Sequence, residues 1–352
     1  MGKIICGIQQ MGVGVNNLGD AWKWYRTHFG MDIRAFEDEA VAELMLPHTD
    51  GKSRKRHAAL ALNMQGGGGF EIWQHTGKTP ENCTFDPQLG DFGIFIAKVK
   101  SQDVKKTFAT FQAAKLDLLS SVVKDPSGNE HFFVKDPYGN IFQIVQEPII
   151  YQKEKSVTGG IYGAVIGISD FEKSKTVYMD ILGYDEIVYD KQGVFDDFAG
   201  LPGGKQPARR ILLKHSQPRT GPFSQLFGPS QIELVVVPTR KARKIFEGRI
   251  WGDPGFIHLC FDIQGMTDLK AECESKGFPF TVDSSNSFDM GEAAGHFSYI
   301  EDPDGTLIEF VETHKLPILK KIGWYMNLKN RKQGKSLPNW MVKTLAWSRI
   351  KE

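Results

Sequence analysis

The sequence lacks the features that mark membrane proteins and disulfide-stabilised secreted domains. None of its apolar runs approaches the roughly 20 residues of a membrane-spanning helix. Its first residues do not form an apolar signal segment with a small-residue cleavage site. There are only four cysteines, and because they include no CxxC pair the sequence predicts neither a zinc knuckle nor a disulfide framework. We therefore expect a cytoplasmic protein.

A net charge of one sign is also lacking, since the formal charge at pH 7 is +1. The basic residues are nevertheless unevenly distributed: from His314 onward the chain has ten Lys or Arg and a single acid, Glu352. No recognised binding motif accompanies this tail, so we expect no nucleic-acid partner. Large apolar residues spaced at three and four over residues 340–347 predict one helix face. That helix either packs on the acidic remainder of the chain or makes a peripheral contact with a membrane or a partner.

What the sequence does contain is a repeat of one structural unit. Each copy opens with a short apolar strand, continues into a helix and ends in about three further strands. Three of the helices are followed by glycine and an apolar residue, which is typical of a helix C-terminus. The first strands of the four copies begin near Ile8, Ile94, Tyr162 and Ile257. The pattern predicts an α+β protein built from four βαβββ units.

Proline, charged residues and glycines over residues 148–160 are typical of a linker. We therefore predict an N-terminal domain over residues 1–150 and a C-terminal domain over residues 151–313, each with two units. Residues 314–352 form the basic, aromatic tail. A long stretch rich in proline and glycine, Ala199–Ser230, interrupts the third unit and is predicted to be a lid.

Two stretches share an Asp-Pro-x-Gly motif that is followed by an apolar strand, at residues 136–146 and 302–312. Proline and glycine at these positions suit a turn, and the strand after the turn ends its repeat unit. The later copy has Glu309 where the earlier one has Gln143. Because a carboxylate binds a metal ion more strongly than an amide does, the motif indicates a duplicated site of which one copy kept its ligand.

Paired βαβββ units, a ligand candidate on a first strand and a glutamate late in a last strand resemble the vicinal oxygen chelate superfamily. This superfamily includes glyoxalase I, the bleomycin-resistance proteins and the extradiol dioxygenases. The resemblance covers roughly residues 4–313 and implies a four-module single chain with two glyoxalase-like domains of curved mixed sheets. Each unit of such a protein offers two ligand positions, one on its first strand and one on its last. In chain order the implied pairs are Gln10 with Glu71, Ile94 or Ile96 with Gln143, Gly163 with Glu233, and His258 with Glu309.

Two arrangements of these positions remain open. If the site lies across the two halves, the first and fourth units together supply Gln10, Glu71, His258 and Glu309. If it lies within the C-terminal half, the set is Glu233, His258 and Glu309, with a glycine where a second histidine would be expected. We favour the first arrangement because it fills all four positions, and because glyoxalase I itself uses a Gln/Glu/His/Glu combination.

The first arrangement would suit a divalent ion such as Zn, Ni, Co, Mn or Fe. Two adjacent open positions on the ion would accept a small substrate with vicinal oxygens. Glu309, or alternatively Glu71, could act as the general base. The resemblance thus implies a metal-dependent lyase or isomerase that works through an enediolate-type intermediate.

Gly14 and Pro254 stand where glyoxalase I has the arginines that bind glutathione, so the reaction is not obviously glutathione-dependent. Two alternatives stay open. One is an extradiol-type ring-cleaving dioxygenase with Fe(II), which typically needs two histidines and one carboxylate. The other is a metal-free small-molecule binding or resistance protein. In each case we expect a small-molecule ligand and a monomer or homodimer.

Overall fold

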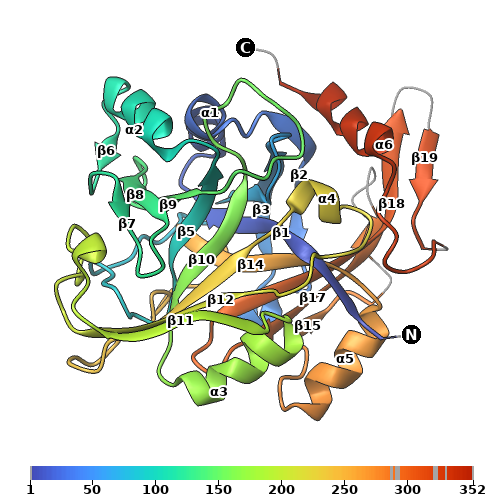
Figure 1. Ribbon diagram of the computed structural model, residues 1–352. Coiled ribbons are helices and arrows are strands. Elements are labelled where there is room, and N and C mark those ends of the chain that lie inside the picture. The colour runs from blue at the N-terminus through green and yellow to red at the C-terminus, as the bar shows by residue number, and fades with distance from the viewer. Residues whose placement is uncertain (1, 286–287, 290–293, 320–323, 330, 351–352) are drawn as a thin grey trace.

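The structure is a computed structural model and describes residues 2–285, 288–289, 294–319, 324–329 and 331–350. Figure 1 shows two curved sheets with helices packed against them. The first unit contains β1 (Ile4–Gly14), α1 (Leu18–Phe29), β2 (Ile33–Ala42), β3 (Arg54–Leu62) and β4 (Gly69–His75). The second contains β5 (Gly93–Ser101), α2 (Val104–Ala113), β6 (Asp117–Leu118), β7 (Val123–Lys124), β8 (Glu130–Lys135) and β9 (Ile141–Gln146).

The third and fourth units repeat this order. The third contains β10 (Ile161–Gly167), α3 (Phe171–Lys175), a π-helical turn (Thr176–Ile181), β11 (Glu186–Gly193), β12 (Ala208–Lys214), α4 (Ser224–Phe227) and β13 (Gln231–Val236). The fourth contains β14 (Gly255–Gln264), α5 (Met266–Ser275), β15 (Val282–Asp283), β16 (Phe288–Asp289), β17 (Ala294–Glu301) and β18 (Leu307–Leu319). After it come β19 (Trp324–Asn327), α6 (Asn339–Lys343) and the 3-10 helix η5 (Thr344–Ser348). The predicted α+β fold of four βαβββ units is confirmed.

Each sheet takes its strands from both halves of the chain. The first sheet combines the first and fourth units in the order β15-β17-β18-β14-β1-β4-β3-β2. The second sheet combines the third and second units in the order β11-β12-β13-β10-β5-β9-β8-β6. In the middle of the first sheet β1 and β14 are antiparallel, whereas β4 is parallel to β1 and β18 is parallel to β14. This order places the first strands and last strands of units one and four side by side.

The two units of each half are joined on the helix-covered side of the sheets. Tyr25 of α1 donates a hydrogen bond of 2.7 Å to Asp136, in the Asp-Pro-x-Gly turn of the second unit. Tyr178 donates one of 2.8 Å to Asp302, in the corresponding turn of the fourth unit. Both aspartates also accept backbone amides of their own turns. The motif therefore shapes a turn and also fastens that turn to the helix of the preceding unit.

Glycines allow the backbones of the two sheets to approach closely. Gly67 precedes β4 and has a φ of 107°, in the left-handed region that favours glycine. A Cβ atom added to Gly67 would lie 2.7 Å from the backbone of Gly160, which precedes β10. The amides of Gly160 and Ile161 donate to the carbonyls of Gly66 and Gly68, over 2.7 Å each. The glycine-rich segment of unit one is thus a contact between the sheets.

The lid predicted for Ala199–Ser230 is wrong. The segment contains β12, the strand that pairs with both β11 and β13, and Ile211, Leu212 and Leu213 of this strand are buried. The remainder leads to α4, whose Phe227 side chain lies against Gly7 of β1. The proline and glycine content therefore belongs to the turns around a core strand and to a connection between the sheets.

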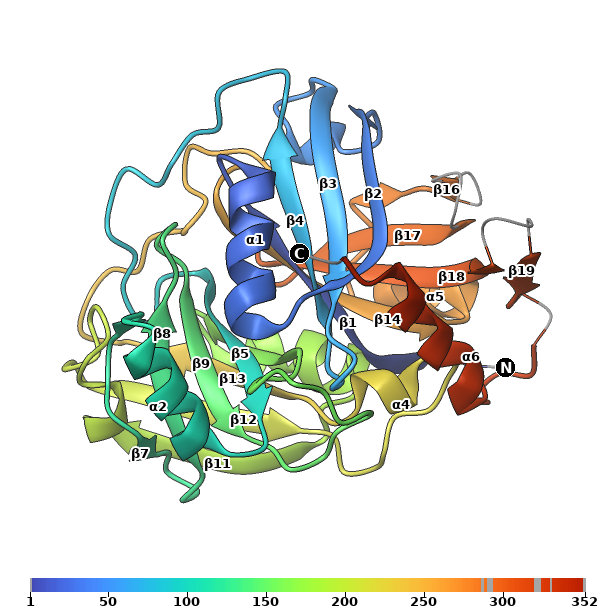
Figure 2. The same cartoon turned by 90° about the horizontal axis from the view of Figure 1, so that it is seen from above.

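The basic tail packs on the rest of the chain. Strand β18 runs into it and pairs with β19, after which α6 leads to η5, and η5 lies beside β2 (Figure 2). Leu337 and Val342 join a buried cluster with Ile33 and Leu60. Arg349 forms ion pairs with Asp32 and with Glu154, the latter at 3.0 Å. Of the two alternatives for the tail, packing is observed, and contact with a membrane or a partner stays a prediction.

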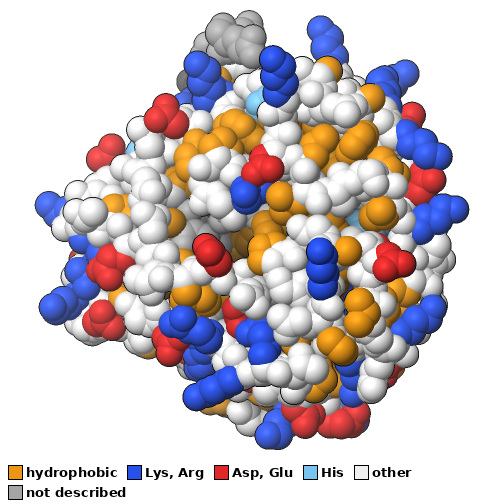
Figure 3. All heavy atoms as spheres, turned by 90° about the vertical axis from the view of Figure 1, so that its left-hand side faces the viewer, with side chains coloured by type: hydrophobic (Ala, Val, Ile, Leu, Met, Phe, Trp, Pro, Cys, Tyr) orange, Lys and Arg blue, Asp and Glu red, His pale blue; other side chains and the backbone are white. Residues whose placement is uncertain are grey.

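Within the described residues, no helix has the length and apolar character needed to cross a membrane. On the face that Figure 3 shows, hydrophobic side chains form separate groups, and charged side chains of both signs surround them. This mixture matches the formal net charge of +1.

Candidate metal centre

Sheet topology brings Gln10, Glu71, His258 and Glu309 together. They lie on β1, β4, β14 and β18, which are consecutive in the order β18-β14-β1-β4. Gly12 pairs with both His258 and Glu71, and Cys260 pairs with both Gln10 and Glu309. Because residues two apart on a strand share a face, the four side chains project from one face of the sheet. The cross-half set that the sequence favoured is the set that converges.

The four functional groups are close enough to share one ion. The ligand atoms of Glu71, His258 and Glu309 all lie within 4.8 Å of one another. His258 Nε2 is 3.2 Å from Glu71 Oε2 and 3.1 Å from Glu309 Oε2. Gln10 Nε2 donates to the same two oxygens over 3.2 and 3.4 Å. All four residues are buried, with relative exposures of 9% or less for the whole residue.

Two buried polar atoms of the site have no well-aligned hydrogen bond, namely Gln10 Oε1 and His258 Nε2. Such atoms are uncommon in a folded protein, because a buried acceptor without a partner loses its hydrogen bonds to water and gains none in exchange. An amide oxygen, an imidazole nitrogen and two carboxylates are together a suitable donor set for a borderline divalent cation. The residues present therefore fit a metal ion.

The electrostatics of the site favour a positive charge between the carboxylates. Burial by itself lowers the pKa of His258, but Glu309 and Glu71 outweigh burial and raise the pKa to about 9. The imidazole thus carries a proton at neutral pH when no other cation neutralises the two glutamates. A bound divalent ion would take over that role and displace the proton.

A β-bulge and a glycine shape the site. The register between β1 and β14 shifts between Ile8 and Gln10, so that one additional residue, Gln9, opposes β14. Gln9 donates to Asp262 over 3.4 Å, while Gln10 turns to the carboxylates. A Cβ atom on Gly12 would lie 2.5 Å from His258 Cε1. Only glycine at this position leaves room for the imidazole ring.

Sequence reasoning missed Tyr299, which orients His258. The Tyr299 hydroxyl lies 3.4 Å from His258 Nδ1, the ring nitrogen that faces away from the carboxylates. Tyr299 is on β17 directly opposite Glu309 in the hairpin that the 302–305 turn closes. Counting back from that turn in antiparallel register would have found it. The contact keeps Nε2 directed into the site.

One wall beside the site is apolar and aromatic. Tyr299 belongs to a buried cluster with Trp73, Trp251, Met45 and Val282. The rings of Trp73 and Trp251 meet edge to face with centroids 4.1 Å apart. Through Tyr299 this buried cluster packs beside the His258 ring, with centroids 5.5 Å apart.

The second sheet shows what became of the equivalent positions. In the first sheet, Glu71 pairs with Gly12, and the ligand candidate Gln10 comes two residues before Gly12. In the same way Glu309 pairs with Cys260, and His258 comes two residues before Cys260. In the second sheet Lys98 pairs with Gln143, so the equivalent first-strand position, two residues earlier, is Ile96 rather than Ile94. Val165 pairs with Glu233, so the equivalent first-strand position of the third unit is Gly163.

The alternative ligand set with Glu233, His258 and Glu309 is not assembled. Glu233 lies on β13 in the second sheet, where Lys98 Nζ and Arg210 Nε each approach its carboxylate to 2.7 Å. The Tyr189 hydroxyl donates to it over 2.8 Å. Two cations of the chain itself already satisfy this carboxylate, so it has no free charge to offer a metal ion.

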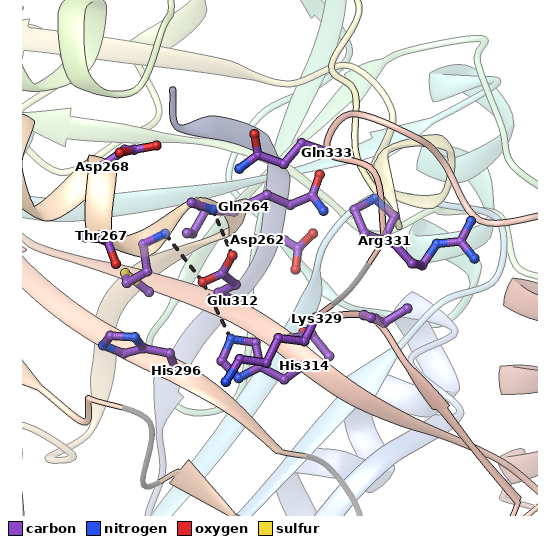
Figure 4. Close-up of a pocket in the computed structure, with 16 residues that line it drawn as sticks. Asp262, Gln264, Thr267, Asp268, His296, Glu312, His314, Lys329, Arg331 and Gln333 are labelled. Atoms are coloured by element: carbon purple, nitrogen blue, oxygen red, sulfur yellow. Dashed lines mark hydrogen bonds and ion pairs between the residues drawn. The ribbon is translucent and has the colours of Figure 1, made fainter. Parts of the chain in front are cut away.

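A pocket of about 380 Å³ lies farther along the first sheet, between the end of β14, the start of α5 and the tail (Figure 4). None of the four converging residues lines it. Glu312 accepts the backbone amides of Gly265 and Met266 and pairs with His314 at 3.5 Å, so it supports the beginning of α5. Burial raises the pKa of Asp262, beside it, to about 8.

Comparison with known proteins agrees with this architecture. Residues 7–144 match the model of the Glyoxalase/Bleomycin resistance protein/Dioxygenase superfamily. No curated protein matches the sequence. A solved structure of a "putative dioxygenase" from Bacillus subtilis subsp. subtilis str. 168 is similar over 99% of this chain and 97% of its own, with a TM-score of 0.58 and 11% identity.

Glyoxalase I from Zea mays is similar over 88% of this chain and 92% of its own, with a TM-score of 0.52 and 12% identity. A mutant of the same enzyme gives a TM-score of 0.55 at 13% identity, over 88% of this chain and 94% of its own. At these identities the likeness concerns the fold alone. Residues 7–144 are therefore similar to the glyoxalase/bleomycin resistance protein/dioxygenase superfamily, and the chain as a whole has a duplicated, glyoxalase-like fold.

Proposed function

We propose that the chain is a metal-dependent lyase or isomerase whose ion is held by Gln10, Glu71, His258 and Glu309. The observation that carries the proposal is the convergence of these four side chains from adjacent strands of two distant units. Two buried carboxylates so close together favour a cation between them, and Gln10 Oε1, which has no hydrogen-bond partner, and His258 Nε2 supply two more ligand atoms.

A divalent ion bound there would act as a Lewis acid toward the vicinal oxygens of a small substrate. The chain itself must supply a base that removes a proton from the carbon next to a substrate carbonyl. Glu71 and Glu309 are the candidates, with side-chain exposures of 12% and 8%. Tyr299 holds the His258 ring in place, and Trp73 and Trp251 pack in the buried cluster behind it.

The donor set argues against the dioxygenase alternative. An iron dioxygenase of this kind typically uses two histidines and one carboxylate, whereas the described cluster has one histidine and two carboxylates. The absence of glutathione-binding arginines at Gly14 and Pro254 argues for an α-oxygenated substrate other than a glutathione adduct. The metal-free binding protein stays an alternative that metal content separates from both enzymes.

The decisive experiment is elemental analysis of the purified chain and of single variants. We expect a bound divalent ion in the wild type and its loss in His258→Ala and Glu309→Ala. Glu71→Ala and Gln10→Ala should weaken binding, and Glu233→Gln, in the second sheet, is the matched control that should keep the ion. Retention of the ion in both Glu71→Ala and Gln10→Ala would refute the four-residue site. A wild type without metal would favour the binding protein.

The general base can then be assigned with conservative variants. Glu309→Gln and Glu71→Gln each remove one carboxylate charge while keeping the side-chain shape. In deuterated water the enzyme should replace the α-hydrogen of an α-hydroxy ketone with deuterium, which NMR can follow. This exchange should stop in the variant that lacks the base. Metal content of the same two variants separates loss of the base from loss of the ion.

A further inference from the structure

Two tryptophans of the tail are unusually exposed. Trp340 is 55% and Trp347 65% exposed, although tryptophan is generally well buried in folded proteins. They belong to α6 and η5, and Lys343 between them is also exposed. We call Trp340, Lys343 and Trp347 the Trp face. Between these positions Val342 and Thr344 are buried against the body of the protein. One face of the segment thus packs on the core, and the Trp face, with two large apolar side chains and a lysine, points away from it.

The Trp face belongs to a well-anchored segment. Arg349 forms ion pairs with Asp32 and Glu154 and shares a β-bridge with Ile33. The Tyr151 hydroxyl donates to the carbonyl of Asn339 over 3.0 Å. The inner face of the segment is already used for this packing. The exposed tryptophans thus form a fixed surface on the folded protein.

The surroundings of the Trp face are basic. Residues 331–350 and the adjacent segment 149–155 together contain seven Lys or Arg and one acid, Glu154. Glu154 and Asp32, the residue before β2, both pair with Arg349. The exposed cations are Lys153, Lys155, Lys332, Lys335 and Lys343. Ile149, at the start of the adjacent segment, is a further apolar side chain with 57% exposure. The surface therefore combines large apolar side chains with a net positive charge.

We propose that this surface binds the interface of a membrane that contains anionic lipids. Tryptophan favours the boundary between acyl chains and headgroups, where its ring is apolar and its N–H can bond to water. Lysines next to it are attracted by anionic headgroups. A second copy of the chain is a poor occupant, because a symmetric contact would place one basic surface against another. Charge complementarity thus selects an anionic bilayer.

Sedimentation of the full chain with lipid vesicles tests the proposal. We expect binding to phosphatidylcholine vesicles that contain phosphatidylserine, weak binding to phosphatidylcholine alone, and loss of binding at high salt. Trp340→Ser combined with Trp347→Ser should weaken binding by about tenfold or more. Ile187→Ser with Val194→Ser is the matched control, since these side chains are also exposed, at 45% and 59%, but lie near β11 in the second sheet.

Changing Lys332, Lys335 and Lys343 to glutamate tests the charge independently of the tryptophans, and this variant should lose binding to anionic vesicles. His258→Ala should bind vesicles as the wild type does, because the surface does not depend on the metal centre. Equal binding by the wild type and the tryptophan variant would overturn the proposal, as would no binding at all. Dimerisation that the tryptophan variant abolishes, seen by light scattering, would assign the surface to a second copy instead.

Discussion

The two sheets are versions of one scaffold that bury carboxylates in opposite ways. In the first sheet, Glu71 and Glu309 converge with His258 and Gln10, a donor set that suits a divalent cation. In the second sheet, only Glu233 remains at an equivalent position, and Lys98 and Arg210 neutralise it within the chain. The difference teaches that the second sheet neutralises its carboxylate within the chain, whereas the proposed metal ion would neutralise the pair in the first sheet.

The strand registers show how the exchange was made. Lys98 of the second unit pairs with Gln143, and Cys260 of the fourth unit pairs with Glu309. These are equivalent positions, so the second unit has a cationic side chain where the fourth has a small thiol. Arg210 stands two residues before the partner of Glu233 on β12. The same position on β3, two residues before the partner of Glu71, is Ala58. Small residues in the first sheet thus leave a space that long cationic side chains fill in the second.

The largest expected effect comes from breaking the internal ion pairs of the second sheet. Arg210 is fully buried and bonds to Glu233 and, over 2.8 Å, to Asp197. Arg210→Met would leave these two carboxylates with less positive charge and should lower the free energy of unfolding by about 3–5 kcal/mol. Urea denaturation measures this change.

Arg209→Met is the matched control, because Arg209 is the neighbouring arginine on the same strand and pairs with Asp190 near the surface. Arg209→Met should lower the free energy of unfolding by no more than about 1 kcal/mol. Equal losses in the two variants would show that the second sheet does not depend on its buried cations.

Removal of the metal should destabilise the chain through the first sheet only. If the ion is present at about 100 times its dissociation constant, chelation should lower the free energy of unfolding by about 2.7 kcal/mol. Thermal unfolding with and without a chelator reports the change, and elemental analysis should give about one ion per chain. His258→Ala should no longer respond to the chelator, whereas Glu233→Gln should. Two ions per chain would contradict the assignment of the second sheet.

A pH dependence should distinguish a buried acid that lacks a cation from one that has it. Glu233 is fully buried, yet Arg210 and Lys98 outweigh burial and hold its pKa well below the usual range. Burial raises the pKa of Asp262, in the first sheet, to about 8. The folded state therefore keeps a proton on Asp262 that the unfolded state releases, so stability falls as the pH rises from about 4 to 8.

Asp262→Asn removes this titration. The free energy of unfolding of this variant relative to the wild type should rise by about 2.7 kcal/mol between pH 5 and pH 7, as measured by urea denaturation at each pH. Asp268→Asn is the control, since Asp268 is exposed on the neighbouring helix α5. The same pH profile in both variants would rule out Asp262 as the source.

The smallest expected effect concerns the space that Gly12 leaves for His258. Gly12→Ala would place a Cβ atom 2.5 Å from the imidazole, which must then shift. We expect metal affinity to fall by about tenfold, as for other changes that disturb the orientation of a ligand. Metal titration measures this loss. Gly19→Ala should bind metal normally, because the nearest atom to its Cβ would be 3.5 Å away. Unchanged affinity in Gly12→Ala would place His258 outside the metal's ligands.

Much of the local structure was readable from the sequence. Hydrophobic periodicity and the Asp-Pro-x-Gly turns predict four βαβββ units, because these signals depend on residues that are close along the chain. The predicted lid failed for a related reason, since the turns on both sides of β12 conceal a core strand between them. Tyr299 escaped notice because its role depends on the register of a hairpin rather than on its residue type.

By itself, then, the sequence determined the repeat unit, its turns and the kinds of side chain available at the ligand positions. The tertiary structure decided which units share a sheet, and so it joined Gln10 and Glu71 to His258 and Glu309 instead of to Gln143. It also decided that Glu233 is satisfied by Lys98 and Arg210, and that the tail packs on the body with Trp340 and Trp347 outward. The physical reason is that strand pairing across some 250 residues depends on packing and charge between distant segments, which local patterns along the chain do not encode.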